Sequence, residues 1–238
     1  MARAPLAYAA AAVKRFYAQA RVSADGGIEL DGKPVRTPSR RPLLLPSPAL
    51  AEAVAEEWNG QSERVDPRAM PLTGLANAAI DRVAPDPDAF ARGLAAYGET
   101  DLLYYRAEAP PRLVERQAER WDPILAWARR RYDVDFQVTR GVVHMPQPQA
   151  TVDRLAYAVL ARSAFELAGL SPLVTVSGSL LVALALTEGA IDAEAAWAAA
   201  ALDEQWQAEQ WGEDAEAAAV LAARRRDFEA AYRFLTLL

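Results

Sequence analysis

The chain has 238 residues, of which 52% are hydrophobic and 24% are charged, and its 26 basic and 32 acidic side chains give a formal net charge of −6. Such a composition is typical of a well-packed globular protein, and the acidic balance argues against nucleic acid or an anionic membrane as the main partner. The sequence contains no cysteine, which excludes a disulfide framework, a thiolate metal site and a thiol nucleophile.

The first sixty residues predict a mixture of helices and short antiparallel strands. Residues 6–17 are rich in alanine and predict a helix. Turn residues at 25–27 and 31–33 separate short apolar runs at 28–30 and 35–37, the pattern of an antiparallel meander.

Residues 43–45 lie between two prolines and predict a further strand at an edge of the sheet. Ser47 followed by Pro48 predicts a helix N-cap with proline at the first helical position. One face of this helix carries an apolar stripe formed by Leu50, Val54 and Trp58. This stripe predicts that Trp58 has a structural role in the core.

The middle of the chain predicts further core helices. Residues 71–83 have the clearest amphipathic period, and the next helix begins at Asp86 and ends at Gly98. Residues 102–106 fit either a strand or a helix. Residues 112–132 predict a helix that Pro123 either kinks or restarts.

If Pro123 restarts the helix, Asp122 is expected to be the N-cap of the second part. Residues 136–139 and 142–145 are joined by an Arg-Gly pair and predict a second hairpin.

A proline-rich segment at 145–149 predicts a boundary between domains at residues 1–146 and 147–238. The second part predicts only helices, which indicates a bundle. Their ranges are about 152–160, 178–188, 192–211 and 215–238. Residues 170–186 are strongly apolar, but polar residues interrupt them and they are too short to span a membrane, so they predict a buried core helix. The predicted fold class is therefore α+β with two domains.

Catalytic motifs are weak. His144 is the only histidine, and its place in a predicted strand favours a structural role. A triad of His144 with Ser177 or Ser179 lacks the Gly-x-Ser-x-Gly pattern, and these serines more simply cap a helix. No glycine-rich phosphate loop occurs, so the sequence predicts neither a nucleotide nor another cofactor.

Acids, glutamines and tryptophans are concentrated at residues 202–214. Positions seven apart return to nearly the same side of a helix, so Trp197, Glu204 and Trp211 are expected on one face. A carboxylate between two indoles loses hydration and needs a cation or several donors. We expect Glu204 to meet either an internal arginine or an arginine of a partner, and the sequence leaves both alternatives open.

The same segment offers carboxylates for a hard metal ion or for an acid/base pair. Without histidine ligands, and with glutamines between the acids, we expect no metal. The acidic residues are Asp203, Glu204, Glu209, Glu213 and Asp214.

Eight motifs in order, spread over nearly the whole chain, resemble one family, the assembly chaperones of the F-type ATP synthase catalytic head, and among these the one that holds the free alpha subunit. The motifs are KRFY (14–17), DGKPVRTP (31–38), EEW (56–58), MPLTGLANAAID (70–81), TDLLYYR (100–106), QAERWDPILAW (117–127), SGSLLVALAL (177–186) and LDEQWQAEQWGED (202–214). Two departures are Tyr104, where relatives commonly have cysteine, and Trp206, where tyrosine is common.

The resemblance implies an N-terminal α+β domain with antiparallel strands followed by an orthogonal helical bundle. It also implies a chaperone without enzymatic activity that shields the intersubunit surface of the unassembled alpha subunit. The family's acidic pair maps onto Asp203 and Glu204, followed by Gln207 and Trp211. With Trp197 from the helical spacing, these residues are the predicted partner-binding site.

Two other functions remain as alternatives. One is a small-molecule enzyme that uses the carboxylates near Glu204, for which a deep pocket shared with His144 would be the sign. The other is a subunit that stays in the finished synthase. We expect a monomer when the protein is free, in a bacterial cytoplasm, with the mitochondrial matrix as the place of organellar relatives.

Overall fold

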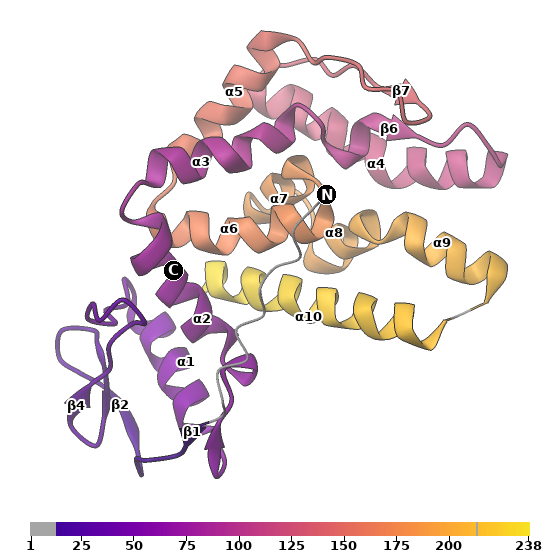
Figure 1. Ribbon diagram of the computed structural model, residues 1–238. Coiled ribbons are helices and arrows are strands. Elements are labelled where there is room, and N and C mark those ends of the chain that lie inside the picture. Colours follow the sequence, from indigo (N-terminus) through magenta and orange to yellow (C-terminus); the bar gives the residue numbers. More distant parts are fainter. Residues whose placement is uncertain (1–12, 213) are drawn as a thin grey trace.

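The computed structural model describes residues 13–212 and 214–238 (Figure 1). Helices form most of it, and the strands are short. The strands are β1 (Val13–Lys14), β2 (Ala20–Val22), β3 (Ile28–Leu30), β4 (Lys33–Pro34), β5 (Arg64–Val65), β6 (Tyr105–Arg106) and β7 (Thr139–Arg140). The α-helices are α1 (Pro48–Asn59), α2 (Pro71–Ala78), α3 (Pro87–Ala95), α4 (Pro111–Tyr132), α5 (Gln149–Leu160), α6 (Ala164–Ser177), α7 (Leu180–Thr187), α8 (Ala193–Ala200), α9 (Leu202–Trp211) and α10 (Ala215–Thr236). The fold class is α+β, as predicted.

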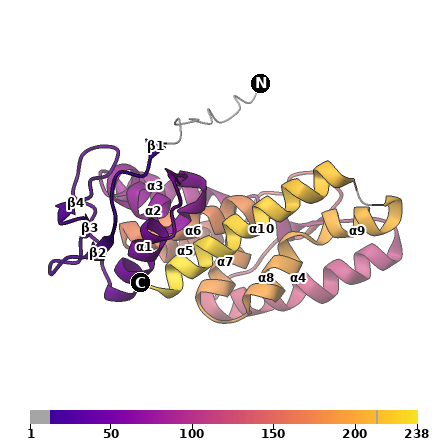
Figure 2. The ribbon, with the colours of Figure 1, turned by 90° about the horizontal axis from the view of Figure 1, so that it is seen from below.

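The molecule is elongated (Figure 2). Strands β2, β3 and β4 lie with α1 at one end, and α9 lies with the beginning of α10 at the other. Helix α10 runs between these ends, and Phe234 in its last turn belongs to the same buried cluster as Ile28 and Leu50. The C-terminal helix therefore connects the sheet to the distant tip.

The predicted meander is confirmed. Strands β2, β3 and β4 form an antiparallel sheet in that order. Asp31 and Gly32 have φ angles of 49° and 78°, which is the geometry of a tight hairpin turn. Residues 35–37 and 43–45 are extended, but they are held by isolated bridges and single hydrogen bonds instead of forming regular strands.

The alanine-rich helix predicted at 6–17 lies mostly outside the described residues. Within them the prediction is wrong, because β1 pairs antiparallel with β5 through Val13 and Val65. Pairing with a strand about fifty residues away overrides the local preference of alanine for helix.

Helix α1 begins as predicted, with the Ser47 hydroxyl accepting a hydrogen bond from the Leu50 amide. Near the end of α1, the Glu57 carboxylate accepts hydrogen bonds from the amides of Leu72 and Thr73 at 2.7 and 2.8 Å. Helix α2 has no capping side chain of its own, so Glu57 of α1 supplies the missing acceptor. Helix α2 continues through a wider helical turn, Ala79–Val83, which confirms the helix predicted at 71–83.

Trp58 lies beside the end of the sheet. Its indole is half-buried and packs on the ring of Tyr17 with the ring centres 5.7 Å apart. It touches the two small clusters that hold the strands to α1. The contacts support the structural role predicted for this tryptophan.

Helix α4 runs through Pro123 without interruption, so a fresh start at Asp122 is wrong. Trp121, Ile124 and Leu125 are all buried around the proline, and this burial offsets the lost backbone hydrogen bond. Asp122 pairs instead with Arg106 at 2.7 Å.

The prediction of a second hairpin from residues 136–139 and 142–145 is also wrong. Strand β7 pairs parallel with β6, and residues 142–145 form an exposed loop. Residues 102–106 combine both predicted alternatives, since a 3₁₀ turn at Leu102–Tyr104 leads directly into β6.

The apolar segment at 170–186 forms two helices instead of one. Gly178 has a φ angle of 68°, which ends α6, and Ser179 then caps α7 as predicted. The carboxylate of Asp101 is completely buried at this break. It accepts hydrogen bonds from the Ser179 hydroxyl at 2.7 Å and from the amides of Leu103 and Leu181 at 3.0 Å.

The burial of Asp101 raises the pKa of its carboxyl group to about 6, although these donors act in the opposite direction.

Helices α6 and α10 approach each other closely at Gly169. A Cβ atom at this position would lie 2.7 Å from the side chain of Leu235, closer than van der Waals contact allows. Glycine is therefore needed where the last turns of α10 cross α6.

The main buried cluster includes residues from both sides of the boundary predicted at 146, such as Trp121 and Leu125 before it and Leu155 and Leu184 after it. Residues 147–238 contain only helices among the elements described, as predicted. The division into two domains stays a prediction. No helix in the described part of the chain is both long and apolar enough to pass through a membrane.

Candidate functional site

The helix predicted from Asp192 to Trp211 is broken at Ala201 into α8 and α9. Asp192 caps α8 as predicted. The break turns Trp197 into the core, where it is 4% exposed and packs on Phe228 with the ring centres 5.8 Å apart. The face expected to combine Trp197, Glu204 and Trp211 is therefore wrong, because seven-residue spacing applies only within one continuous helix.

A groove of about 580 Å³ lies between α9 and α10, at the tip seen at the lower right of Figure 1. We call it the α9–α10 groove. Apolar side chains of both helices line it, among them Val220, which is 56% exposed, and Trp211, which is 79% exposed. Large apolar side chains this exposed and this close together are typical of a protein-binding surface.

Glu204 and Arg224 form an ion pair at one side of the groove, with 2.6 Å between nitrogen and oxygen. Arg224 also donates to the backbone oxygen of Val176 at 2.8 Å, which attaches α10 to the end of α6. The Glu204 side chain is 44% exposed. Of the two alternatives for this carboxylate, the structure shows the internal arginine.

Asp203 faces inward. Its carboxylate accepts a hydrogen bond from the Gln117 amide at 2.9 Å, and Gln117 in turn accepts one from the backbone amide of Ala107. Gln207 is exposed and lines the groove. Five residues were predicted to bind a partner. Glu204, Gln207 and Trp211 line the groove, and Asp203 adjoins it. Trp197 does not line it and is buried in the core.

The outer side of α9 is attached to α4. Arg116 pairs with Glu209 at 2.8 Å and lies over the Trp206 ring, 4.9 Å from its centre. The hydrogen bond from Arg116 holds the pKa of the Glu209 carboxyl below its usual value. Trp206 is buried, so its ring packs inside the protein and is not part of the groove surface.

The charges around the groove are mostly negative. Glu204, Asp214 and Glu216 line it, and among the lining residues that the structure describes Arg224 is the one cation. Glu213 lies outside the described residues. An apolar floor with acids at its edge favours a partner surface that is apolar and basic.

The candidate catalytic side chains from the sequence, His144, Ser177 and Ser179, do not line the α9–α10 groove. His144 lies in the exposed loop, with its Nδ1 atom 3.1 Å from the Tyr105 hydroxyl. Ser177 donates to the backbone oxygen of Leu173, and Ser179 caps α7. Within the described ranges, no three acidic or histidine side chains come together as metal ligands would.

Sequence reasoning missed the contribution of α10 to this site. Arg224 begins a run of three arginines, which a sequence alone presents as a solvated helix face. Val220 and Arg224 are four residues apart and therefore share a side of α10, which was the available signal.

The chain is similar to solved structures over nearly its whole length. The structure of Atp12 from Paracoccus denitrificans is 45% identical to this chain, with a TM-score of 0.89, and the match covers 94% of this chain and 98% of that one. A mutant of the same protein matches with the same identity and TM-score over 94% of this chain and 97% of that chain.

Comparison with sequences gives the same result. Residues 14–129 match the family described as "ATP12 chaperone protein". "Protein atp12, mitochondrial" of Schizosaccharomyces pombe is 26% identical over 214 residues, which are 84% of this chain and 74% of that protein. The chain belongs to the ATP12 chaperone family, which confirms the resemblance found in its motifs.

Proposed function

We propose that this protein is an assembly chaperone that binds the unassembled alpha subunit of F-type ATP synthase and shields its intersubunit surface until the catalytic head is assembled. Family membership supports the chaperone part of this proposal. The observation that carries the binding part is the α9–α10 groove, where exposed Trp211 and Val220 lie beside acidic side chains.

Tryptophan is the residue most often found as an anchor in protein interfaces, because it buries a large rigid surface at a small cost in conformational entropy. Trp211 is free to act as such an anchor, because most of its side chain is in contact with solvent. Trp197 is buried against Phe228 and would not touch the client.

Glu204 gives the groove its specificity in this proposal. In the free protein its carboxylate holds Arg224. An arginine of the client would take the place of Arg224 or join it on the same carboxylate, since a carboxylate has two oxygens that accept several hydrogen bonds. The pair is partly exposed, so its separation costs little.

The test is capture of tagged alpha subunit by the Glu204→Lys variant, measured by pull-down and by the free energy of unfolding in urea. We expect capture to be lost, because the new ammonium group repels a basic client surface and removes the acceptor. Stability should change by less than about 1 kcal/mol, because the ion pair is partly exposed. The matched control is Glu52→Lys, a charge reversal at an exposed position on α1 at the other end of the molecule.

Full capture by Glu204→Lys would refute the role of Glu204. Gross unfolding of this variant would show that the pair with Arg224 holds the structure together instead. Equal loss of capture in Glu52→Lys would mean that overall charge decides binding and that the groove does not.

The protein acts as a monomer when it has no client and works in the cytoplasm of a bacterium, whereas organellar relatives work in the mitochondrial matrix. An enzyme that uses the carboxylates near Glu204 has less support, because His144 does not line the groove and bonds Tyr105 instead. Co-purification with the finished synthase would indicate the remaining alternative, a permanent subunit.

A further inference from the structure

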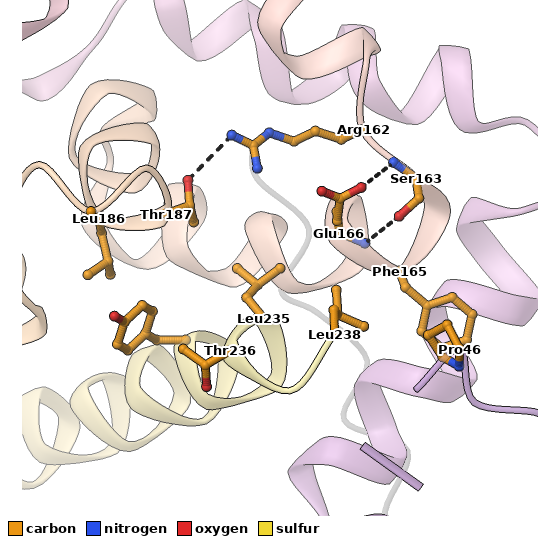
Figure 3. Close-up of a pocket in the computed structure, with 12 residues that line it drawn as sticks. Pro46, Arg162, Ser163, Phe165, Glu166, Leu186, Thr187, Leu235, Thr236 and Leu238 are labelled. Carbon is orange, nitrogen blue, oxygen red and sulfur yellow. Dashed lines mark hydrogen bonds between the residues drawn. The ribbon is translucent and has the colours of Figure 1, made fainter. Parts of the chain in front are cut away.

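A second cavity lies far from the α9–α10 groove, where the last turn of α10 meets the beginning of α6 and the end of α7 (Figure 3). Its volume is about 600 Å³, within the range of pockets that hold small molecules. Most of its wall is apolar and includes Phe165, Leu186, Leu235 and Leu238. We call it the C-terminal cavity.

One cation lies in this apolar wall. The side chain of Arg162, just before α6, extends across the cavity toward Thr187 (Figure 3) and is 15% exposed. Its single described hydrogen bond goes to the Thr187 hydroxyl and is long, at 3.4 Å. The Nε atom is buried and has no acceptor.

The carboxylates near Arg162 are already occupied. Glu188 forms a long ion pair with Arg162, with 3.9 Å between nitrogen and oxygen, which is beyond hydrogen-bond distance. The Glu188 oxygens accept hydrogen bonds from Arg131 at 2.6 Å and from the Tyr132 hydroxyl at 2.7 Å instead. Glu166 accepts from the Ser163 amide at 2.8 Å and caps α6. Arg162 is therefore a largely buried guanidinium with fewer acceptors than it can use.

A buried guanidinium without full hydrogen bonding is costly, and a carboxylate that approaches it gains two parallel hydrogen bonds. We propose that the C-terminal cavity binds a small amphipathic carboxylate, with the carboxylate on Arg162 and an apolar chain against the wall formed by Leu186, Leu235 and Leu238. The ligand carries a single acid group because, among the described residues that line the cavity, Arg162 is the one cation. Its chain is apolar because burial there removes apolar surface of both partners from water.

Octanoate is the probe, and 1-octanol, which has the same chain without the charge, is its matched control. Isothermal titration calorimetry at pH 7 should show octanoate binding to the full-length protein at least about tenfold more tightly than octanol, because the charged hydrogen bonds are lost. Octanoate should also shift the methyl resonances of Leu186 and Leu235, a measurement that needs no variant.

Arg162→Gln should weaken octanoate binding by about tenfold or more and remove the preference over octanol. Arg154→Gln on α5, which changes an exposed arginine paired with Asp133, is the control and should leave binding unchanged. Equal binding of octanoate and octanol, or an unaffected Arg162→Gln variant, would overturn the proposal. So would tighter binding of a short peptide with a free C-terminal leucine, since the occupant would then be the end of a polypeptide.

Discussion

Two carboxylates near helix junctions, those of Asp101 and Glu204, have opposite surroundings. Asp101 is completely buried at the break between α6 and α7 and accepts three hydrogen bonds from within the chain. Glu204 lies at the edge of the α9–α10 groove with one ion pair and open access to solvent. The same chemical group therefore holds the fold together in one place and remains available to a partner in the other.

The largest effect is expected at the buried carboxylate. Asp101→Ala leaves the Ser179 hydroxyl and two backbone amides without an acceptor in the core, so we expect a loss of about 3 to 5 kcal/mol in the free energy of unfolding. Urea unfolding monitored by tryptophan fluorescence measures it. Glu204→Ala is the control and should cost less than about 1 kcal/mol. Similar losses of unfolding free energy in both variants would show that Asp101 and Glu204 do not differ in their contribution to stability.

Replacing the tryptophan that holds the sheet should have the next largest effect. Trp58→Arg removes the contact with Tyr17 and places a charge between two apolar clusters, for an expected loss of about 3 kcal/mol. Thermal unfolding measures the change. Trp58→Phe keeps an aromatic ring beside Tyr17 and breaks no hydrogen bond, because the indole nitrogen has no partner, so it should cost less than the arginine. A folded Trp58→Arg variant of normal stability would contradict the structural role.

The buried carboxylate also predicts a pH dependence. The pKa of Asp101 rises from 3.8 to about 6 on folding, so between these values the folded chain binds a proton more tightly than the unfolded chain does. The contribution of this group to stability is therefore largest below pH 4 and falls by up to about 3 kcal/mol as the pH rises to 6 and above.

Urea unfolding of the native chain and of Asp101→Asn, each at pH 4.5 and at pH 7, measures the contribution of the Asp101 carboxyl to stability. The advantage of the native chain over the variant should be larger at pH 4.5. The comparison with the variant is necessary because other carboxyls, such as Asp31 and Glu209, have a lowered pKa. Their contribution to the free energy of unfolding decreases as the pH falls, which is the opposite of the change expected from Asp101. An advantage that grows toward pH 7 would show that the hydrogen bonds outweigh burial at Asp101.

The smallest effect on stability is expected at the exposed indole. Trp211→Ala should change the free energy of unfolding by less than about 0.5 kcal/mol, because most of the side chain is already in water. Capture of the alpha subunit should fall by about tenfold or more if this indole is an anchor. Tyr157→Ala, at an exposed aromatic on α5, is the control. If Trp211→Ala lost much stability but captured the alpha subunit normally, Trp211 would be a structural residue and not an anchor for the client.

Capping residues were the part of the fold that the sequence predicted best. Ser47, Asp86, Ser179 and Asp192 each start a helix as predicted, because the bond between a capping side chain and a nearby amide is local. Failures came from contacts that are distant in the sequence. The parallel pairing of β6 with β7 and the pairing of β1 with β5 join segments more than thirty residues apart.

The candidate site was predicted only in part for the same reason. The acidic motif located α9, and the exposed positions of Glu204 and Trp211 agree with a surface role. The break at Ala201 contains neither glycine nor proline, so the sequence gives no sign that the helix ends there. Trp197 was therefore expected on the same exposed face as Glu204, whereas it lies in the core. The second wall of the groove comes from α10, and only the packing of two helices brings Arg224 to Glu204.

The close approach of α6 and α10 at Gly169 has a mechanical consequence. A single added methyl group there would push Leu235 and Phe234 outward, and these side chains face different places. Leu235 borders the C-terminal cavity, and Phe234 lies in the core beside α1 and the sheet. The distance between the two helices at Gly169 therefore fixes the position of the last turn of α10, and with it both one wall of the cavity and the contact of α10 with the sheet.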